Sequence, residues 1–207
     1  EPLLDALAAH LVELNFDVKA FTRTLLSSRA YQLSARANDS NLRDEQNFSR
    51  AAWKPLPAEV LLDAICQVTG VPEQFNGWPL GYRAIQVWDN RMPSYFFRIF
   101  GRPQRVSVCQ CERGDQPSIA QALHLMNSPE SVRKIRHRDG RVSRLLADHN
   151  DDRLIEHLYL AALSRPPRAE ELALMREAFA DPRATRREAA EDVLWTLLNS
   201  REFVFNH

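Results

Sequence analysis

The chain contains 207 residues, of which 44% are hydrophobic and 26% are charged, a composition typical of a folded globular protein. Its 27 lysines and arginines balance 27 aspartates and glutamates, so no net field draws the chain toward nucleic acid or an acidic membrane surface. No run approaches the roughly 20 apolar residues that a membrane-spanning helix needs. The composition therefore disfavours a nucleic-acid partner and excludes a membrane span in this sequence.

The three cysteines, Cys66, Cys109 and Cys111, are too few for a fold held together by disulfides, so the core must come from apolar burial. The sequence begins Glu1-Pro2 without a methionine or a signal-like segment, and we expect a fragment whose upstream part is missing. A covalent haem motif and a phosphate-binding glycine loop are both absent. We therefore expect no cofactor in this fragment, and a haem only in a missing upstream domain.

The first third of the chain predicts two helices and a loop. Helical spacing of leucines predicts a first helix at about Pro2–Leu14. Asp17 is a suitable N-cap for a second helix, which we expect at about Val18–Leu33. The residues that follow, about 34–56, are rich in asparagine, serine and charges, and they predict a long irregular loop.

The middle third combines one clear helix with irregular backbone. Pro57 opens a third predicted helix that ends at Gly70, a natural C-cap. The segment of about 71–116 contains several prolines and glycines and should be irregular. Within it we expect a short strand at Tyr82–Trp88, a short aromatic helix at Pro93–Phe100 and an extended stretch at Arg105–Cys111.

From Pro117 onward the pattern is helical again, with a good helix start at Asn150-Asp151 and proline boundaries at Pro166-Pro167 and Asp181-Pro182. The expected helices span 117–128, 130–138, 141–148, 151–163, 168–180 and 184–201. Together these patterns predict an all-α fold of short amphipathic helices with two long irregular loops and at most a short strand pair. Because most connections are short, we expect residues 1–207 to form a single helical domain.

Cys109 and Cys111 lie two residues apart, so in an extended segment both side chains point to the same face. They could share a soft metal, but a tetrahedral site needs two more ligands, which His124 or His137 would have to supply. The pair could also be two buried small hydrophobes, a strained disulfide or a redox-active dithiol. The spacing does not choose among these interpretations.

Polar residues gather around the helix predicted at 117–128. Arg113 lies just before its positive N-terminus and could clamp a carboxylate or phosphate, or pin a loop to backbone carbonyls. Gln121, His124 and Asn127 follow at a spacing of three, and this stripe could line a cleft or be satisfied inside a core. The catalytic candidates are His124 and Arg113. The candidates for ligand binding are Arg113, Gln121 and Asn127.

Aromatic residues are dense in the middle third of the chain. Such density in a Gly/Pro-rich segment can form a platform on which sugar rings stack, or it can fill a core where regular structure is poor. The residues concerned are Trp53, Trp78, Tyr82, Trp88, Tyr95, Phe96 and Phe97.

The chain resembles a C-terminal domain of unknown function (family 1553) found in large multi-domain proteins of planctomycetes and related bacteria. Those proteins often also contain a cytochrome-c-like domain. The resemblance covers nearly the whole chain and depends on a combination of helix-boundary and turn motifs. These motifs are Asp17–Tyr31, Leu56–Ala64 with Thr69-Gly70, Phe100–Pro103, Cys109–Arg113, Gln121–Asn127, Leu163–Pro166 and Trp195–Phe203.

The resemblance implies an extracytoplasmic, mostly helical module with no established reaction to transfer. Cys109 and Arg113 match the broad pattern of the family, whereas Cys111 resembles a feature of one subgroup. A metal site shared by both cysteines would therefore not be general to the family. Arg168 stands where related chains tend to place a Thr or Ser helix cap, which puts the local capping in doubt but not the helix.

Three functional hypotheses follow, and the residues do not indicate whether the chain is an enzyme. The first is an interaction or structural module of a secreted or surface protein that packs on upstream domains of the same chain. The second is a carbohydrate-related enzyme or binding domain with its site near residues 109–127. The third is a redox partner module of a cytochrome-c-like domain, with Cys109 and Cys111 as the dithiol.

Overall fold

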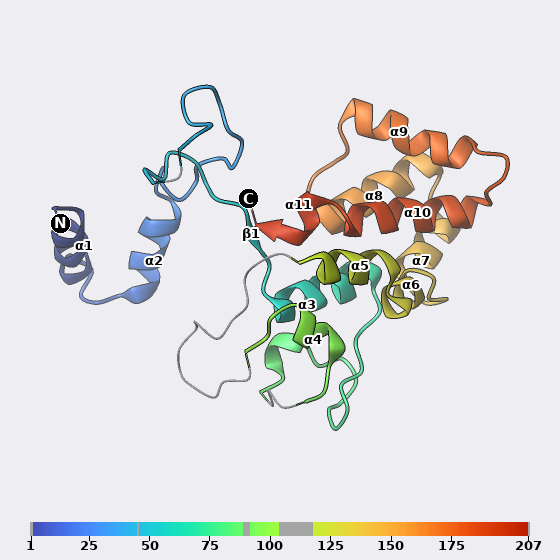
Figure 1. The fold of residues 1–207 in the computed structure, drawn as a ribbon, viewed down its shortest axis with the longest axis horizontal. Helices are drawn as coiled ribbons and strands as arrows, with labels where there is room; N and C mark the ends of the chain where they lie inside the picture. Colours follow the sequence, from blue (N-terminus) through green and yellow to red (C-terminus); the bar gives the residue numbers. More distant parts are fainter. Residues whose placement is uncertain (1, 45, 89–91, 104–117, 207) are drawn as a thin grey trace. The chain divides into compact units, whose positions relative to one another are not determined.

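The computed structural model describes residues 2–44, 46–88, 92–103 and 118–206 (Figure 1). Its contacts divide the chain into two units, one up to Trp53 and one from Lys54 to Asn206, and each is described by itself. The predicted all-α class is confirmed. Strand structure within the described ranges is limited to the two-residue strands β1 (Lys54–Pro55) and β2 (Phe205–Asn206). The expectation of a single domain stays a prediction.

The N-terminal unit opens with two helices, α1 (Pro2–Glu13) and α2 (Val18–Leu26). The predicted cap of α2 is confirmed, because one Asp17 carboxylate oxygen accepts the backbone N–H groups of Lys19 and Ala20 at 2.9 and 3.0 Å. The predicted length of α2 was wrong, since the helix stops at Leu26 rather than near Leu33. Ser28 offers its hydroxyl oxygen to the Tyr31 N–H at 3.3 Å, a local bond that competes with a further helical turn.

Irregular backbone follows α2 as far as Trp53, as predicted for most of this stretch. Side-chain bonds to the backbone hold it, and Asp44 makes the most of them. Its carboxylate accepts the Ser49 hydroxyl and the backbone N–H groups of Gln46, Asn47 and Ser49. These bonds, the Ser49 hydroxyl first, hold the pKa of Asp44 well below its usual range. The loop is therefore defined by polar contacts rather than by a core.

The second unit contains most of the helices. After β1 come α3 (Ala58–Thr69), the short 3-10 helix η1 (Ala84–Gln86), α4 (Tyr95–Ile99), α5 (Ile119–Asn127), α6 (Pro129–Ile135), α7 (Arg141–Asp148), α8 (Asp151–Leu163), α9 (Ala169–Ala180), α10 (Arg186–Leu198) and α11 (Arg201–Val204), before β2. The predicted bounds of α7 and α8 are confirmed to the residue. The capping roles of Asn150 and Gly70 are confirmed too, Gly70 with a φ of 71°.

Two further predictions in this unit were wrong. Tyr82–Trp88 forms no strand, because the Asp63 carboxylate on α3 accepts the N–H groups of Ala84 and Ile85 and so occupies donors that a ladder would need. The helix expected at 184–201 ends at Leu198, and the Ser200 hydroxyl caps the separate α11 by accepting the Phe203 N–H at 3.2 Å. The extended stretch expected at Arg105–Cys111 lies outside the described residues.

The predicted helix 130–138 also ends early, at Ile135. His137–Gly140 forms a turn in which the Gly140 N–H donates to the His137 carbonyl at 2.9 Å. This turn redirects the chain into α7 and explains the difference.

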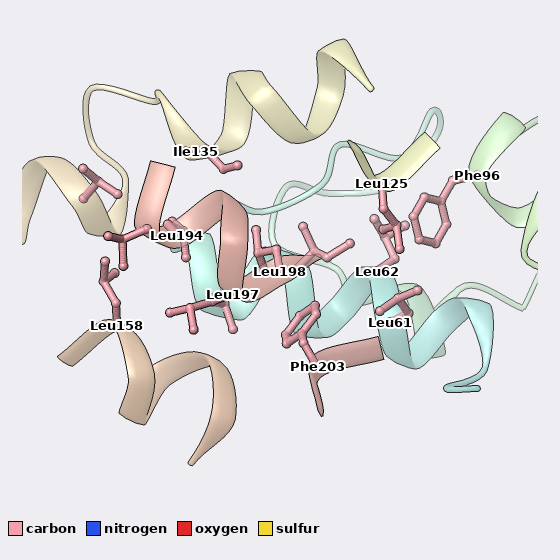
Figure 2. Close-up of a cluster of buried hydrophobic side chains, with 14 of the residues drawn as sticks. Leu61, Leu62, Phe96, Leu125, Ile135, Leu158, Leu194, Leu197, Leu198 and Phe203 are labelled. Atoms are coloured by element: carbon pink, nitrogen blue, oxygen red, sulfur yellow. The ribbon is translucent and has the colours of Figure 1, made fainter. Parts of the chain in front are cut away.

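Helix α10 forms the centre of the core. It packs against α6, α7, α8, α9 and α11, and its side chains at Ala190, Val193, Leu194 and Leu197 are all buried. Figure 2 shows leucines of α10 facing side chains of α3, α8 and α11. The residues labelled there are Leu61, Leu62, Phe96, Leu125, Ile135, Leu158, Leu194, Leu197, Leu198 and Phe203.

The ends of this unit are joined by its two strands. β1 pairs antiparallel with β2, placing Lys54 opposite Asn206, and the Leu56 N–H donates to the Val204 carbonyl at 3.0 Å. The chain therefore enters and leaves the unit at one place. This closure brings residues near 55 and near 204 to a common surface that the sequence pattern alone did not indicate.

Candidate functional site

Helix α5 contains the described part of the predicted polar site, and its first turn is fixed by a capping box. The Ser118 hydroxyl accepts the Gln121 N–H at 3.3 Å, while the Gln121 side-chain oxygen accepts the Ser118 N–H at 3.1 Å. The Gln121 side-chain nitrogen donates to the Ile99 carbonyl at 2.8 Å. Gln121 thus joins the start of α5 to the end of α4.

His124 lies among aromatic rings of the α4 segment. Its ring centroid is 5.4 Å from that of Tyr95, 5.6 Å from Phe96 and 6.2 Å from Phe100. Partial burial lowers the pKa of His124, and the Glu130 carboxylate opposes this shift. The imidazole is therefore mainly neutral at pH 7 and is packed as part of an aromatic cluster.

The structure brings only part of the predicted stripe together. Gln121 and His124 both contact the α4 segment, whereas the Asn127 side chain is exposed at the other end of α5. Arg113, Cys109 and Cys111 lie outside the described residues. The catalytic and ligand-binding roles assigned from the sequence stay predictions.

A cavity of about 300 Å³ lies beside α5. Its walls come from the β1 segment, α3, Phe100, α5 and the α10–α11 junction, so they join both ends of the unit. The wall is mostly apolar, and its polar groups stand at Ser118, Gln121, Asn199, Ser200 and Arg201. The main apolar contributors are Leu56, Leu61, Phe100, Leu125, Val204 and Phe205.

Most residues of this cavity were missed by sequence reasoning. Gln121 was a candidate, but the contributions of β1 and α11 depend on a strand pair between segments about 150 residues apart in the chain. The pairing of two-residue strands leaves no periodic pattern that a single sequence would reveal. The cavity is a mostly apolar pocket with a few polar groups, which is the general character of a small-molecule site.

An ion-pair cluster supports the α11 side of this cavity. The Arg165 guanidinium donates to the Glu171 carboxylate on α9 at 2.7 and 2.8 Å and to the Glu202 carboxylate on α11 at 2.6 and 2.7 Å. The Arg165 bonds are the main reason that the pKa of Glu171 falls to about 2. The cluster fixes α9 and α11 to the end of α8 and so has a structural role.

Glu171 supplies one half of a capping box at the start of α9. The Glu171 carboxylate accepts the Arg168 backbone N–H at 2.7 Å. The Arg168 guanidinium has no acceptor, so the bond that a Thr or Ser side chain would accept at this position is not made. The helix begins at Ala169, one residue after the predicted start at 168, and ends at Ala180 as predicted.

Five of the aromatic residues of the middle third belong to two groups, whereas Tyr95 contacts His124 and Trp53 lies in the first unit. Phe96 and Phe97 are buried and join Phe75 and Phe100 in the core. Trp78, Tyr82 and Trp88 form a second group that reaches the surface, which we term the Trp88 cluster. Core filling, one of the two uses weighed from the sequence, therefore holds for Phe96 and Phe97, whereas a sugar-binding platform stays a prediction.

The described residues contain no group of three or more His, Cys, Asp or Glu side chains placed to hold a metal ion. Cys66 is a half-buried thiol on α3, and burial raises its pKa. No helix among the described residues is long and apolar enough to cross a membrane.

The fold and the cavity define a mainly α-helical protein whose second unit is closed by a strand pair around an apolar pocket. The sequence model of the family described as protein of unknown function (DUF1553) matches residues 1–179, and the chain belongs to this family. Comparisons with curated proteins and with solved structures found no match. The matched range includes Cys109, Arg113 and α5 but ends within α9, so the resemblance expected at Trp195–Phe203 lies beyond it.

Proposed function

We propose that this chain is an interaction module that packs on other domains of a longer, extracytoplasmic multi-domain protein. Exposed apolar side chains on the α1–α2 hairpin support the proposal most directly. Leu3 is 73% exposed, and Leu4, Val12, Phe16 and Val18 are also largely exposed. Several large apolar side chains left open on one pair of short helices favour a contact with another protein surface.

The size of the hairpin strengthens this argument. Helices of 12 and 9 residues are too short to be stable in water by propensity alone, so they depend on tertiary packing. In α1 no residue is buried, although Leu7 and Leu11 are partly covered, as is Leu14 directly after the helix. A partner surface that covers the exposed leucines would supply the missing burial, at about 25 cal/mol per Å² of apolar area.

The proposal predicts self-association when the chain is expressed alone. Because burying one leucine contributes about 1.5 kcal/mol or more, Leu4→Ser should weaken this association by about tenfold, and Phe16→Ser by at least as much. Sedimentation equilibrium over a range of concentrations measures the effect. Leu174→Ser is the matched control, because Leu174 is an exposed leucine on α9 and should leave the association unchanged.

Two outcomes would contradict this function. One is a chain that stays monomeric at high concentration and does not bind a fluorescent probe for apolar surface. The other is association that Leu174→Ser weakens as much as Leu4→Ser does. The extracytoplasmic location and the link to cytochrome-c-like domains follow from the family resemblance, and the redox alternative depends on Cys109 and Cys111.

The cavity beside α5 favours a second candidate function, the binding of a small ligand with an apolar body and a polar end. Its apolar wall suits a hydrocarbon chain better than a sugar, whose hydroxyls would lack partners over most of the surface. Arg201 and Asn199 at its margin could meet a polar or anionic end.

Filling the cavity should abolish such binding. Ala122→Trp places a large side chain in the wall and should raise the dissociation constant of a dansyl-labelled fatty acid by at least about tenfold. Ala120→Trp is the control, because Ala120 lies on the same helix but does not line the cavity. Equal effects of both substitutions, or no binding by the unaltered chain, would remove this candidate.

A further inference from the structure

The Trp88 cluster displays aromatic faces at the surface of the second unit. The Trp78 ring lies 5.1 Å from Tyr82 at 45° and 5.7 Å from Trp88 at 75°. Trp78 is partly buried against the core, whereas Trp88 is 77% exposed. Because the Trp78 and Trp88 rings meet edge to face, they do not stack face to face and hide each other. The Trp88 ring therefore has an aromatic face open to a ligand.

The backbone that presents these rings is irregular but held by specific bonds. The Asp63 carboxylate accepts the N–H groups of Ala84 and Ile85 at 2.6 and 3.2 Å, which fixes the segment to α3. The Gln74 side chain donates to the Trp78 carbonyl at 3.0 Å. Val87, next to Trp88, is buried, and the Arg102 guanidinium donates to its carbonyl. The rings are therefore positioned before any partner arrives.

Among the described residues of this stretch, the exposed cation Arg83 is paired, because its guanidinium lies 3.3 Å from the Asp63 carboxylate. The exposed side chains of Asn76 and Gln86 bring further hydrogen-bonding groups into the same stretch of chain. This combination of open aromatic faces, neutral hydrogen-bonding groups and a paired cation suits an uncharged polyhydroxylated ligand better than an acidic one.

We propose that the Trp88 cluster binds a neutral polysaccharide, with a pyranose ring stacked on Trp88 and hydroxyls bonded to the polar groups beside it. A pyranose with equatorial hydroxyls presents axial C–H groups on its faces, and these are attracted to the negative face of an aromatic ring. The surface differs from the sequence-predicted carbohydrate site near 109–127, and it does not depend on the packing of α1 and α2. It gives the second unit a ligand of its own.

A protein partner is the competing occupant, because Leu80 and Ile85 are also exposed near the cluster. The polar groups favour the glycan, since each stacked sugar brings hydroxyls that need donors and acceptors. A protein contact would instead use the aliphatic side chains together with the rings. Binding of a protein partner should therefore depend on the Leu80 side chain, whereas binding of a glycan should not.

Affinity electrophoresis of the full chain tests the proposal. The probes are gels containing hydroxyethyl cellulose, glucomannan or arabinoxylan, with polygalacturonate as the acidic comparison. We expect retardation in at least one neutral gel and none in polygalacturonate. Trp88→Ala should weaken the apparent affinity by at least about tenfold, and Trp88→Phe, which keeps an aromatic face, by less.

The controls distinguish stacking on Trp88 from nonspecific hydrophobic binding. Leu80→Ser and Leu174→Ala each remove an exposed aliphatic side chain and should leave retardation unchanged, and circular dichroism confirms that every variant is folded. Absence of retardation in all three neutral gels overturns the proposal. Retardation that survives Trp88→Ala, or that Leu80→Ser abolishes equally, overturns it as well, the latter in favour of a protein contact.

Discussion

Leu158→Ala is expected to lower the free energy of unfolding by about 3–4 kcal/mol, within the range for leucines removed from a packed core. Leu158 is fully buried on α8, and Figure 2 shows it beside α10 near Leu194. The substitution removes the transfer free energy of the lost methyl and methylene groups and leaves a cavity. Since α8 and α10 pack directly, the surrounding backbone has little freedom to close that cavity.

Urea unfolding followed by circular dichroism measures this loss. Leu160→Ala is the matched control, because Leu160 lies two residues along the same helix but is 43% exposed. It should cost less than about 1 kcal/mol, since much of its side chain already contacts water. Equal losses of unfolding free energy in Leu158→Ala and Leu160→Ala would show that α8 does not bury the face that contains Leu158.

Arg165→Ala has the second largest expected effect, a loss of about 2–3 kcal/mol. The substitution removes four charge-assisted bonds and leaves the Glu171 and Glu202 carboxylates without the cation they share. Breaking a fully buried ion pair costs about 3–5 kcal/mol, but the Arg165 side chain is 24% exposed, so solvent screening reduces the loss. α9 and α11 would lose their common anchor.

This cluster also makes stability depend on pH. The pKa of Glu171 is about 2 in the folded chain, below the value of about 4.3 for an unfolded glutamate. Because the pKa of Glu171 is lower in the folded chain, the ionised carboxylate stabilises the fold fully above about pH 4.3. This stabilisation is lost as the pH falls from about 4.3 toward 2. In Arg165→Ala this part of the acid dependence should largely disappear.

Thermal melts between neutral and acidic pH measure both effects. Arg183→Ala is the control, because Arg183 pairs with Asp181 at 2.8 Å while its side chain is 89% exposed. Such a surface pair contributes little, so the melting temperature should hardly change. If Arg183→Ala and Arg165→Ala change the melting temperature equally, the Arg165 cluster does not anchor α9 and α11 as its geometry indicates.

Local signals predicted most of the second unit's helices. Asn150 marks the start of α8 because its side chain accepts the Arg153 N–H, a bond made within one turn. Gly70 ends α3 because it adopts a positive φ that other residues avoid. The early end of α2 has an equally local cause, the bond from the Tyr31 N–H to the Ser28 hydroxyl. The missing strand at Tyr82–Trp88 has a long-range cause, because the Asp63 carboxylate binds the N–H groups of Ala84 and Ile85, 21 and 22 residues away.

The candidate site was predicted only in part. Spacing placed Gln121 and His124 on one helix, but it could not show that Gln121 bonds to the Ile99 carbonyl or that His124 packs among Tyr95, Phe96 and Phe100. Those partners belong to α4 and its C-cap residue Phe100, which form a separate element from α5. Such contacts depend on how the chain places one helix against another. The spacing of residues along a single helix carries no information about that placement.

The sequence by itself determined the helical class, the family and the bounds of helices such as α7 and α8, because caps and apolar periodicity act within a few residues. Only the tertiary structure decided what lies on each surface. It separated buried Phe96 from exposed Trp88, although both belong to one aromatic segment. It also built the cavity beside α5 from the two ends of the second unit through the β1–β2 pair. Burial and long-range pairing are properties of the whole packed chain, so no local pattern specifies them.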